Sequence, residues 1–225
     1  MIWLIISLIG VGLSLWAQFR VKSSFSRWSN IPTHSGLTGS VVAREILDRN
    51  GLYDVPVEMV PGVLTDHYDP TVRAVRLSEP VYRSDSIASV SVAAHECGHA
   101  LQHKEAYGAL VFRHRMVPIL NITSGIAPWL LMMGFVLKAM NLVLLGVILF
   151  AGVVLFHLVT LPVEFNASAR AKKILLQQGW ITEGEKRGVD RVLNAAALTY
   201  VGSAVVALGQ LLYYASFLLG RGDED

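Results

Sequence analysis

Apolar residues gather into four long runs, and polar segments separate these runs along the chain. Each run approaches the roughly 20 residues that a helix needs to cross about 30 Å of hydrocarbon. The runs cover residues 2–19, 117–137, 142–161 and 198–219. We predict that all four are transmembrane helices. The first is expected to be an uncleaved signal anchor, because its apolar run is longer than that of a signal peptide.

The polar segment after the first run begins with a predicted helix. Apolar residues have helical spacing over residues 41–50. Thr38 or Ser40 can cap the start of this helix, and Gly51 is placed to stop it.

Two further patterns predict regular structure in the polar segments. Residues 55–63 and 74–77 are rich in valine and flank the turn formers of residues 66–70, which predicts a small hairpin or sheet. After the third run, Thr-Glu-Gly-Glu at residues 182–185 is a capping box. It is expected to open a helix that continues through residues 189–197 into the fourth run.

The segment 93–102 contains the motif His95-Glu96-x-x-His99, which points to a specific chemistry. Histidines at i and i+4 lie on one face of a helix, so both imidazoles can reach a single zinc ion. Glu96 lies about 100° round the helix, where it can act as a general base without occupying a coordination position. The alternative is a buried helix with two hydrogen-bonded histidines and a salt-bridged glutamate. The helical context on both sides favours a zinc hydrolase.

Composition and charge place this chemistry at a membrane. Hydrophobic residues make up 53% of the 225 residues and charged residues only 16%, which is typical of a membrane protein. Residues 20–115 hold eleven of the nineteen lysines and arginines, and residues 162–197 hold six more. The positive-inside rule therefore places both segments in the cytoplasm, with the N-terminus and the acidic tail outside. Topology explains the net charge of +2, so no nucleic-acid partner is expected.

A catalytic zinc needs a third protein ligand from the same side of the membrane. His103 and Glu105 continue the motif helix, but His103 lies about 12 Å along the axis from His95, too far to share one ion. Glu164 lies three residues after the end of the third run, where a divalent cation would offset the cost of a carboxylate at the edge of the hydrocarbon. We predict Glu164 as the third ligand. The alternative is a glutamate that favours a helix start after Pro162.

Two other residues near the motif call for an interpretation. Cys97 is the only cysteine, and it points about 200° away from His95 on a helix, so we interpret it as a small buried hydrophobic residue. His157 lies inside the third run, seven residues before Glu164. It is either a second-shell donor to the metal site or a partner in an interhelical hydrogen bond.

The chain resembles the membrane-bound neutral zinc metallopeptidases of the YugP type, which are relatives of the gluzincins. Four segments carry the resemblance in order, at residues 64–70, 93–102, 161–168 and 192–201. The resemblance implies zinc bound by His95, His99 and Glu164, with Glu96 as the catalytic base.

The resemblance also raises questions about the surrounding residues. Many gluzincins carry an aspartate four residues after the ligand glutamate, where this chain has Ser168, whose hydroxyl can still bond an imidazole N–H. His67, Tyr68 and Tyr200 lie in the resembling segments and can donate hydrogen bonds to an oxyanion. The alternative for His67 and Tyr68 is a turn. By analogy with related folds, an edge strand can align an extended substrate.

These observations predict a mainly α membrane protein, with about four transmembrane helices and a small cytoplasmic α+β zincin-like domain that contains a helix-borne HExxH. The expected parts are a transmembrane anchor at 1–19, a cytoplasmic catalytic region at 20–116, a transmembrane hairpin at 117–161, a cytoplasmic segment supplying the third ligand at 162–197, a transmembrane helix at 198–219 and an acidic tail at 220–225.

The expected function is that of a membrane-anchored zinc endopeptidase that hydrolyses protein substrates at the cytoplasmic membrane face. Zinc lowers the pKa of water towards about 7, and Glu96 takes the proton of that water. One alternative is an intramembrane protease of the site-2 type, although residues 83–115 are too polar for a span. The other is a metal-binding membrane scaffold without catalysis.

Overall fold

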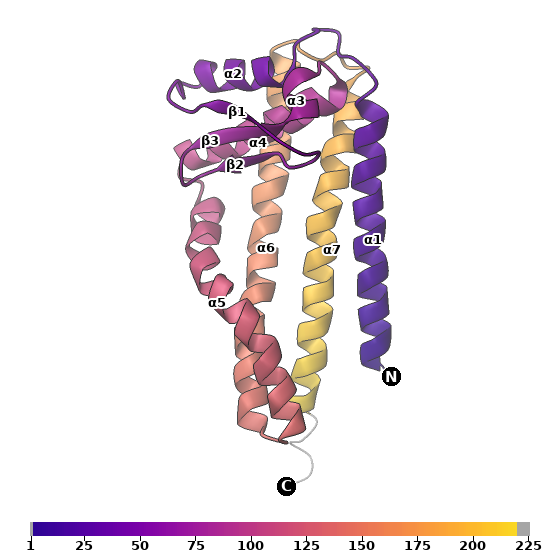
Figure 1. Ribbon diagram of the computed structural model, residues 1–225, viewed down its shortest axis with the longest axis vertical. Helices are drawn as coiled ribbons and strands as arrows, with labels where there is room; N and C mark the ends of the chain where they lie inside the picture. Colours follow the sequence, from indigo (N-terminus) through magenta and orange to yellow (C-terminus); the bar gives the residue numbers. More distant parts are fainter. Residues whose placement is uncertain (1, 220–225) are drawn as a thin grey trace. The chain divides into compact units, whose positions relative to one another are not determined.

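The computed structural model describes residues 2–219 and is mostly helical, with seven helices and one small sheet in this range (Figure 1). The chain divides into two compact units. We call one the sheet unit, Ala17–Leu110 with Val163–Leu198, and the other the apolar unit, which in the described range holds residues 2–16, Val111–Pro162 and residues 199–219. The mainly helical class with a small sheet is confirmed. The predicted acidic tail lies outside the described residues.

Three helices are long and apolar enough to cross a membrane: α5 (Gly108–Val136), α6 (Met140–Gln177) and α7 (Lys186–Leu219). They contain the second, third and fourth predicted runs, apart from Leu137, which follows the end of α5. Helix α1 (Ile2–Trp28) contains the first run, and its crossing of the membrane stays a prediction.

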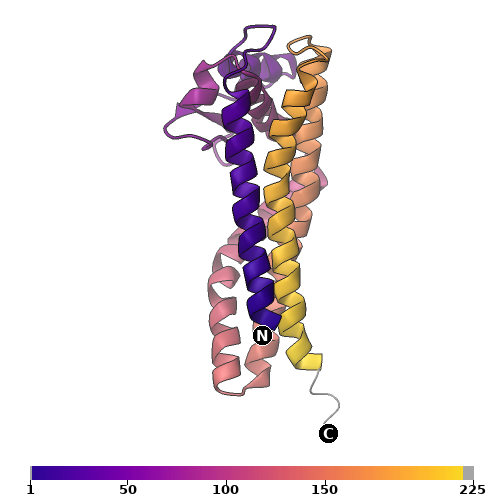
Figure 2. The ribbon, with the colours of Figure 1, turned by 90° about the vertical axis from the view of Figure 1, so that its right-hand side faces the viewer.

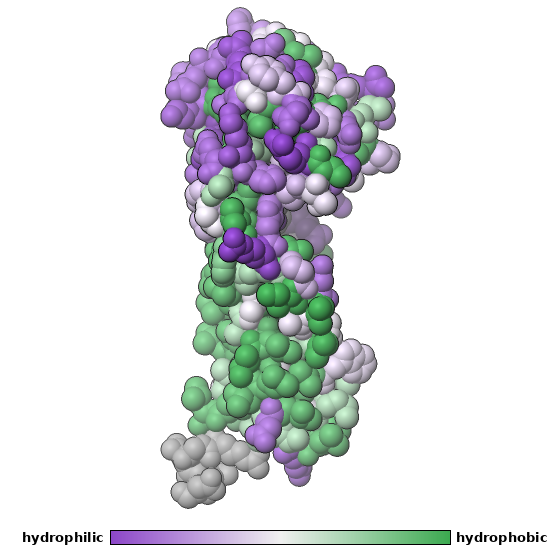
Figure 3. Space-filling view, turned by 90° about the vertical axis from the view of Figure 1, so that its left-hand side faces the viewer, coloured by the Kyte–Doolittle hydropathy of each residue, from purple (hydrophilic) through white to green (hydrophobic). Residues whose placement is uncertain are grey.

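The apolar unit is made only of helices. Its small core consists of Leu131, Val143 and Val147, and α1 and α7 lie side by side in it, where Gly10 faces Val206 (Figure 2). Large hydrophobic side chains cover much of its surface (Figure 3). Such a surface suits contact with lipid, because a soluble protein rarely exposes so large an apolar patch.

In the sheet unit, helix α2 (Gly39–Arg49) forms where the sequence predicts it. The Thr38 hydroxyl accepts a hydrogen bond from the backbone N–H of Val41, and Gly51 follows the helix with a φ of 68°. A positive φ costs glycine little, which makes it an effective helix stop. The expected cap and stop are therefore confirmed.

The sheet has three strands, β1 (Val57–Val60), β2 (His67–Asp69) and β3 (Ala74–Ser78), in the order β1-β3-β2. Strands β1 and β3 are parallel, and β2 is antiparallel to β3.

The prediction of a sheet is confirmed, but two details are wrong. Residues 55–63 and 74–77 do not form a hairpin with each other, because β2 reverses the chain between them and β3 then runs in the direction of β1. His67 and Tyr68 are not in a turn, because both pair with β3 as part of strand β2.

Helix α4 (Ile87–Lys104) runs through the core of the sheet unit. A short helix, α3 (Glu79–Arg83), precedes it, and the Ser86 hydroxyl caps its start by accepting from the N–H of Ser89. α4 packs against α2, and most of its residues are buried. The capping box of α7 is also confirmed, because Thr182 and Glu185 each bond the other's backbone N–H.

The contact between α2 and α3 leaves no room for a side chain at Gly39, because a Cβ there would lie 2.2 Å from the carbonyl oxygen of Val81. We expect Gly39→Ala to lower the free energy of unfolding by about 1–3 kcal/mol through this overpacking. Thermal unfolding of the full-length protein in detergent measures the effect. The matched control is Gly108→Ala, because no atom lies within 4 Å of the added Cβ. Equal unfolding temperatures for the two variants would contradict the prediction.

Candidate metal centre

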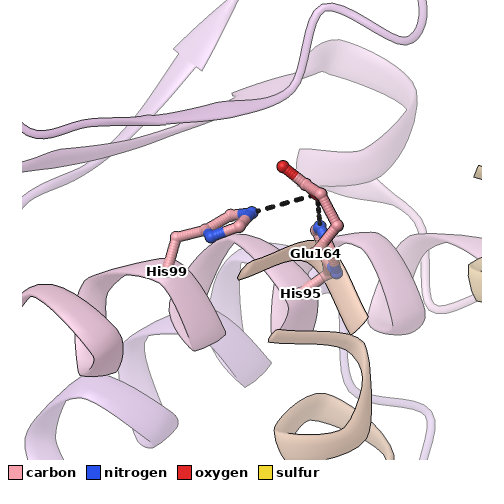
Figure 4. Close-up of side chains that lie close together, drawn as sticks. All are labelled: His95, His99 and Glu164. Carbon is pink, nitrogen blue, oxygen red and sulfur yellow. Dashed lines mark hydrogen bonds and ion pairs between the residues drawn. The ribbon is translucent and has the colours of Figure 1, made fainter. Parts of the chain in front are cut away.

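His95 and His99 lie one turn apart on α4 and face Glu164 of α6 (Figure 4). The Oε2 atom of Glu164 lies 3.3 Å from Nε2 of His95 and 3.5 Å from Nε2 of His99. One ligand atom from each of the three residues lies within 4.8 Å of the other two. The structure therefore brings together the three residues that the sequence predicts as zinc ligands.

Gly98 permits this convergence, because it lets the backbones of α4 and α6 touch. A Cβ on Gly98 would lie 2.8 Å from the carbonyl oxygen of Ala167 and 3.1 Å from its Cα. Real Cβ atoms essentially never come within 3.0 Å of another heavy atom. Any larger residue at this position would force apart the two helices that carry the candidate ligands.

The second ring nitrogen of each histidine has its own partner. Nδ1 of His95 lies 3.1 Å from the Ser168 hydroxyl, and Nδ1 of His99 lies 3.0 Å from Oε1 of Gln102. Because both Nδ1 atoms are engaged, both Nε2 atoms point at the position that Glu164 also faces. Hydrogen bonds of this kind orient imidazole ligands in metal sites.

The orientation of Gln102 fixes the tautomer of His99. The Nε2 of the fully buried Gln102 donates to the carbonyl oxygen of Val163 at 2.8 Å and to Oδ1 of Asn166 at 3.0 Å. Since a carbonyl oxygen only accepts, the amide nitrogen must face it, and the amide oxygen must face His99. Nδ1 of His99 therefore carries a hydrogen, and in the neutral ring the lone pair of Nε2 is left for a metal.

The charges of the cluster are strongly coupled. Glu164 is only 3% exposed. Burial alone would raise the pKa of its carboxyl group, but the hydrogen bonds from His95 and His99 hold this pKa well below its usual range. Burial alone would lower the pKa of His99, yet the hydrogen bond to Glu164 and the charge of Glu96 raise it. The buried carboxylate thus stabilises positive charge at this position, and a metal cation can take the place of the protons.

The donor set and its spacing fit zinc. Two imidazole nitrogens and one carboxylate oxygen are the three protein ligands of many catalytic zinc sites, with bonds of about 2.0–2.2 Å. In a tetrahedral site, bonds of this length separate neighbouring donors by roughly 3.3–3.6 Å. The separations of 3.3 and 3.5 Å from Glu164 to the histidines lie in this range.

Glu96 lies beside the cluster on α4 and is 8% exposed. Within residues 2–219 no hydrogen bond or ion pair engages its carboxylate. Its charge acts on Asp66, whose pKa is raised chiefly by burial and also by Glu96, while hydrogen bonds from Ser78 lower it. The site therefore contains a buried carboxylate whose oxygens are open to a new partner.

The remaining residues of the motif helix lie outside the cluster. Nδ1 of His103 bonds the hydroxyl of Tyr68 at 2.8 Å, and Glu105 pairs with Arg170. Cys97 is fully buried, with its thiol directed at the carbonyl oxygen of Ala43 and its pKa raised by burial. The interpretation of Cys97 as a small buried residue is thus confirmed.

The other predicted site residues are placed as follows. His67 is exposed, and its Nδ1 bonds the carbonyl oxygen of Thr65. Neither His67 nor Tyr68 bonds a residue of the cluster. His157 and Tyr200 belong to the apolar unit, so their suggested roles stay predictions. Sequence reasoning missed Gln102, although its position three residues after His99 on a helix was a usable signal.

The chain is similar to a known protein family and to a named bacterial protein. A family model described as "Putative neutral zinc metallopeptidase" matches residues 2–219. The chain is also 56% identical, over 225 residues and the whole of both chains, to a Bacillus subtilis (strain 168) protein named "Putative membrane protease YugP". No solved structure matches the chain significantly.

We expect Gln102→Leu to weaken zinc binding by about 10–100-fold, because it removes the acceptor for Nδ1 of His99. Competition with a fluorescent chelator measures the affinity. The control is Gln177→Leu, which changes an exposed glutamine at the end of α6. If both variants bind zinc as tightly as the unmodified protein does, Gln102 does not orient His99.

Proposed function

Because the chain belongs to the neutral zinc metallopeptidase family, we propose that it is a membrane-anchored zinc endopeptidase with His95, His99 and Glu164 as metal ligands. The resemblance inferred from the sequence is thereby confirmed at the level of the family. The observation that carries the proposal is the convergence of two imidazole Nε2 atoms and one buried carboxylate at zinc-like spacing.

Zinc, when bound, supplies a Lewis acid that lowers the pKa of water towards about 7 and polarises a peptide carbonyl. Glu96 takes a proton from the attacking water and passes it to the leaving amine as the C–N bond breaks. Its position next to His95 on α4 and its lack of an ion pair within the described chain support this role.

Strand β2 is the element that we expect to align the substrate. It is an edge strand, because β3 pairs with one side of it and no described strand pairs with the other. Its Tyr68 bonds His103 of the motif helix, so β2 lies against α4. An extended peptide that adds to this edge would bind mainly through its backbone. The candidate oxyanion donors are His67, Tyr68 and Tyr200.

We propose that the sheet unit faces the cytoplasm and acts on protein substrates at the membrane surface. The excess of lysine and arginine in residues 20–115 and 162–197 supports this orientation. Helix α4 is not among the described helices that are apolar enough to span a membrane, which disfavours the intramembrane alternative. We propose the same division into transmembrane and cytoplasmic segments that the sequence predicts. In this division, Glu164 belongs to the cytoplasmic segment that follows the transmembrane hairpin.

Glu96→Gln should keep full zinc stoichiometry and lose about 10²–10⁴-fold in activity, because the amide cannot take up the proton. Cleavage of a casein substrate by the detergent-purified protein, with metal analysis of the same sample, measures both quantities. The control is Glu183→Gln, at a carboxylate 77% exposed. Unchanged cleavage by Glu96→Gln would exclude Glu96 as the base.

Glu164→Ala should lose most of its bound zinc, because it removes one of three ligands and leaves two histidines. Equilibrium dialysis against a zinc buffer measures the loss, and size-exclusion chromatography checks that the variant is folded. A folded variant that retains zinc at unchanged affinity would remove Glu164 from the ligand set.

A further inference from the structure

A pocket of about 290 Å³ lies between α1 and α7 within the sheet unit. No role in the metal centre accounts for it. Its lining is formed by the arginines and serines of the two helices and one tryptophan: Arg20, Ser23, Ser24, Arg27, Trp28, Arg187 and Arg191.

The two helices are in firm contact at this pocket. A Cβ on Gly188 of α7 would lie 2.7 Å from the ring of Trp28 on α1, so only glycine allows this approach. α1 and α7 run side by side in both ribbon views (Figures 1 and 2). The walls of the pocket are therefore two closely packed helices, and the arginines that line the pocket lie on these helices.

Four guanidinium groups line the pocket without a carboxylate partner in the described chain. Arg27 stacks near the Trp28 ring at 5.6 Å, and no ion pair joins Arg20, Arg187 or Arg191 to an acidic residue in the part of the chain that the structure describes. The neighbouring acids on α7 and before it are engaged elsewhere, because Asp190 pairs with Lys172 and Glu185 bonds backbone N–H groups. Like charges gathered in this way create a positive potential that attracts an anion.

Ser24 gives a second, independent indication. Its hydroxyl oxygen is buried and, among the side chains that the structure describes, it is the only buried nitrogen or oxygen atom without a hydrogen-bond partner. Buried polar groups in native proteins nearly always have a partner. Ser24 also lines the pocket, so a change of its rotamer on binding would bring the hydroxyl to a ligand that accepts hydrogen bonds.

In the sequence, the residues that line the pocket are close to two of the predicted transmembrane runs. Arg20 directly follows the apolar run at 2–19, and Arg191 lies seven residues before the run at 198–219. Basic pockets between such helices suit the phosphate of a lipid head group.

We propose that this pocket binds a phosphate group. Guanidinium groups bind phosphate oxygens in pairs through parallel N–H donors, and the Ser24 hydroxyl donates a further hydrogen bond. The phosphate group belongs either to the head group of an anionic phospholipid or to free phosphate. The titrations below distinguish these two ligands. Binding here anchors the α1–α7 pair of the sheet unit and is independent of zinc.

Trp28 provides a natural reporter for a direct test. The full-length protein in detergent is titrated with phosphatidylglycerol, with inorganic phosphate and with oleate, which is anionic but has no phosphate. We expect a saturable change in tryptophan fluorescence with phosphatidylglycerol that Trp28→Phe abolishes. A comparable response to inorganic phosphate identifies free phosphate as the source, and an equal response to oleate overturns the proposal.

Variants locate the binding. Arg20→Gln with Arg187→Gln should weaken the affinity at least tenfold, whereas Arg73→Gln with Arg83→Gln removes the same charge elsewhere in the sheet unit and should leave it unchanged. Equal affinities for the two double variants would overturn the proposal.

A measurement on the unmodified protein tests the same proposal without relying on the folding of any variant. Phenylglyoxal labels accessible arginines, and mass spectrometry reports each site. Phosphate or phosphatidylglycerol should slow the labelling of the pocket arginines at least severalfold relative to Arg83. Uniform labelling rates with and without ligand would overturn the proposal.

Discussion

The close approach of α4 to α6 at Gly98 and Ala167 is the contact on which the candidate metal centre depends. It places Glu164 within 3.5 Å of two histidines that are one turn apart on the other helix. A Cβ at Gly98 would lie 2.8 Å from the Ala167 carbonyl oxygen. Since protein interiors are close-packed, a methyl group there must be accommodated by moving one helix. The donor separations that suit zinc would then be lost.

Hydrogen bonds around the cluster make this helix contact specific. Gln102 joins His99 of α4 to the backbone of α6, and Ser168 of α6 joins His95. The Nδ1 atoms of both histidines and the amide group of Gln102 thus have partners, which matters because an unpaired buried polar group costs about 1–3 kcal/mol. The buried Glu164 is balanced by positive charge from the histidines, or by a metal that replaces their protons. Metal binding and helix packing are therefore coupled in one network.

Much of this arrangement could be predicted from the sequence, because the deciding signals are local. The helical spacing of His95 and His99 and the position of Glu164 after an apolar run both indicate one site. The parallel pairing of β1 with β3 could not be predicted, because it depends on how β2 reverses the chain. The role of Gln102 was missed for a similar reason, since its partners on α6 lie about 60 residues away.

X-ray absorption at the zinc K-edge of the zinc-loaded protein reports which atoms bind the metal. We expect nitrogen and oxygen neighbours only, at about 2.0–2.2 Å, with the outer-shell scattering of two imidazoles. Glu164→Ala should change the first shell while both imidazole signals persist in whatever zinc is retained. A sulfur neighbour at about 2.3 Å, or the scattering of fewer than two imidazoles, would contradict a site built from His95, His99 and Glu164.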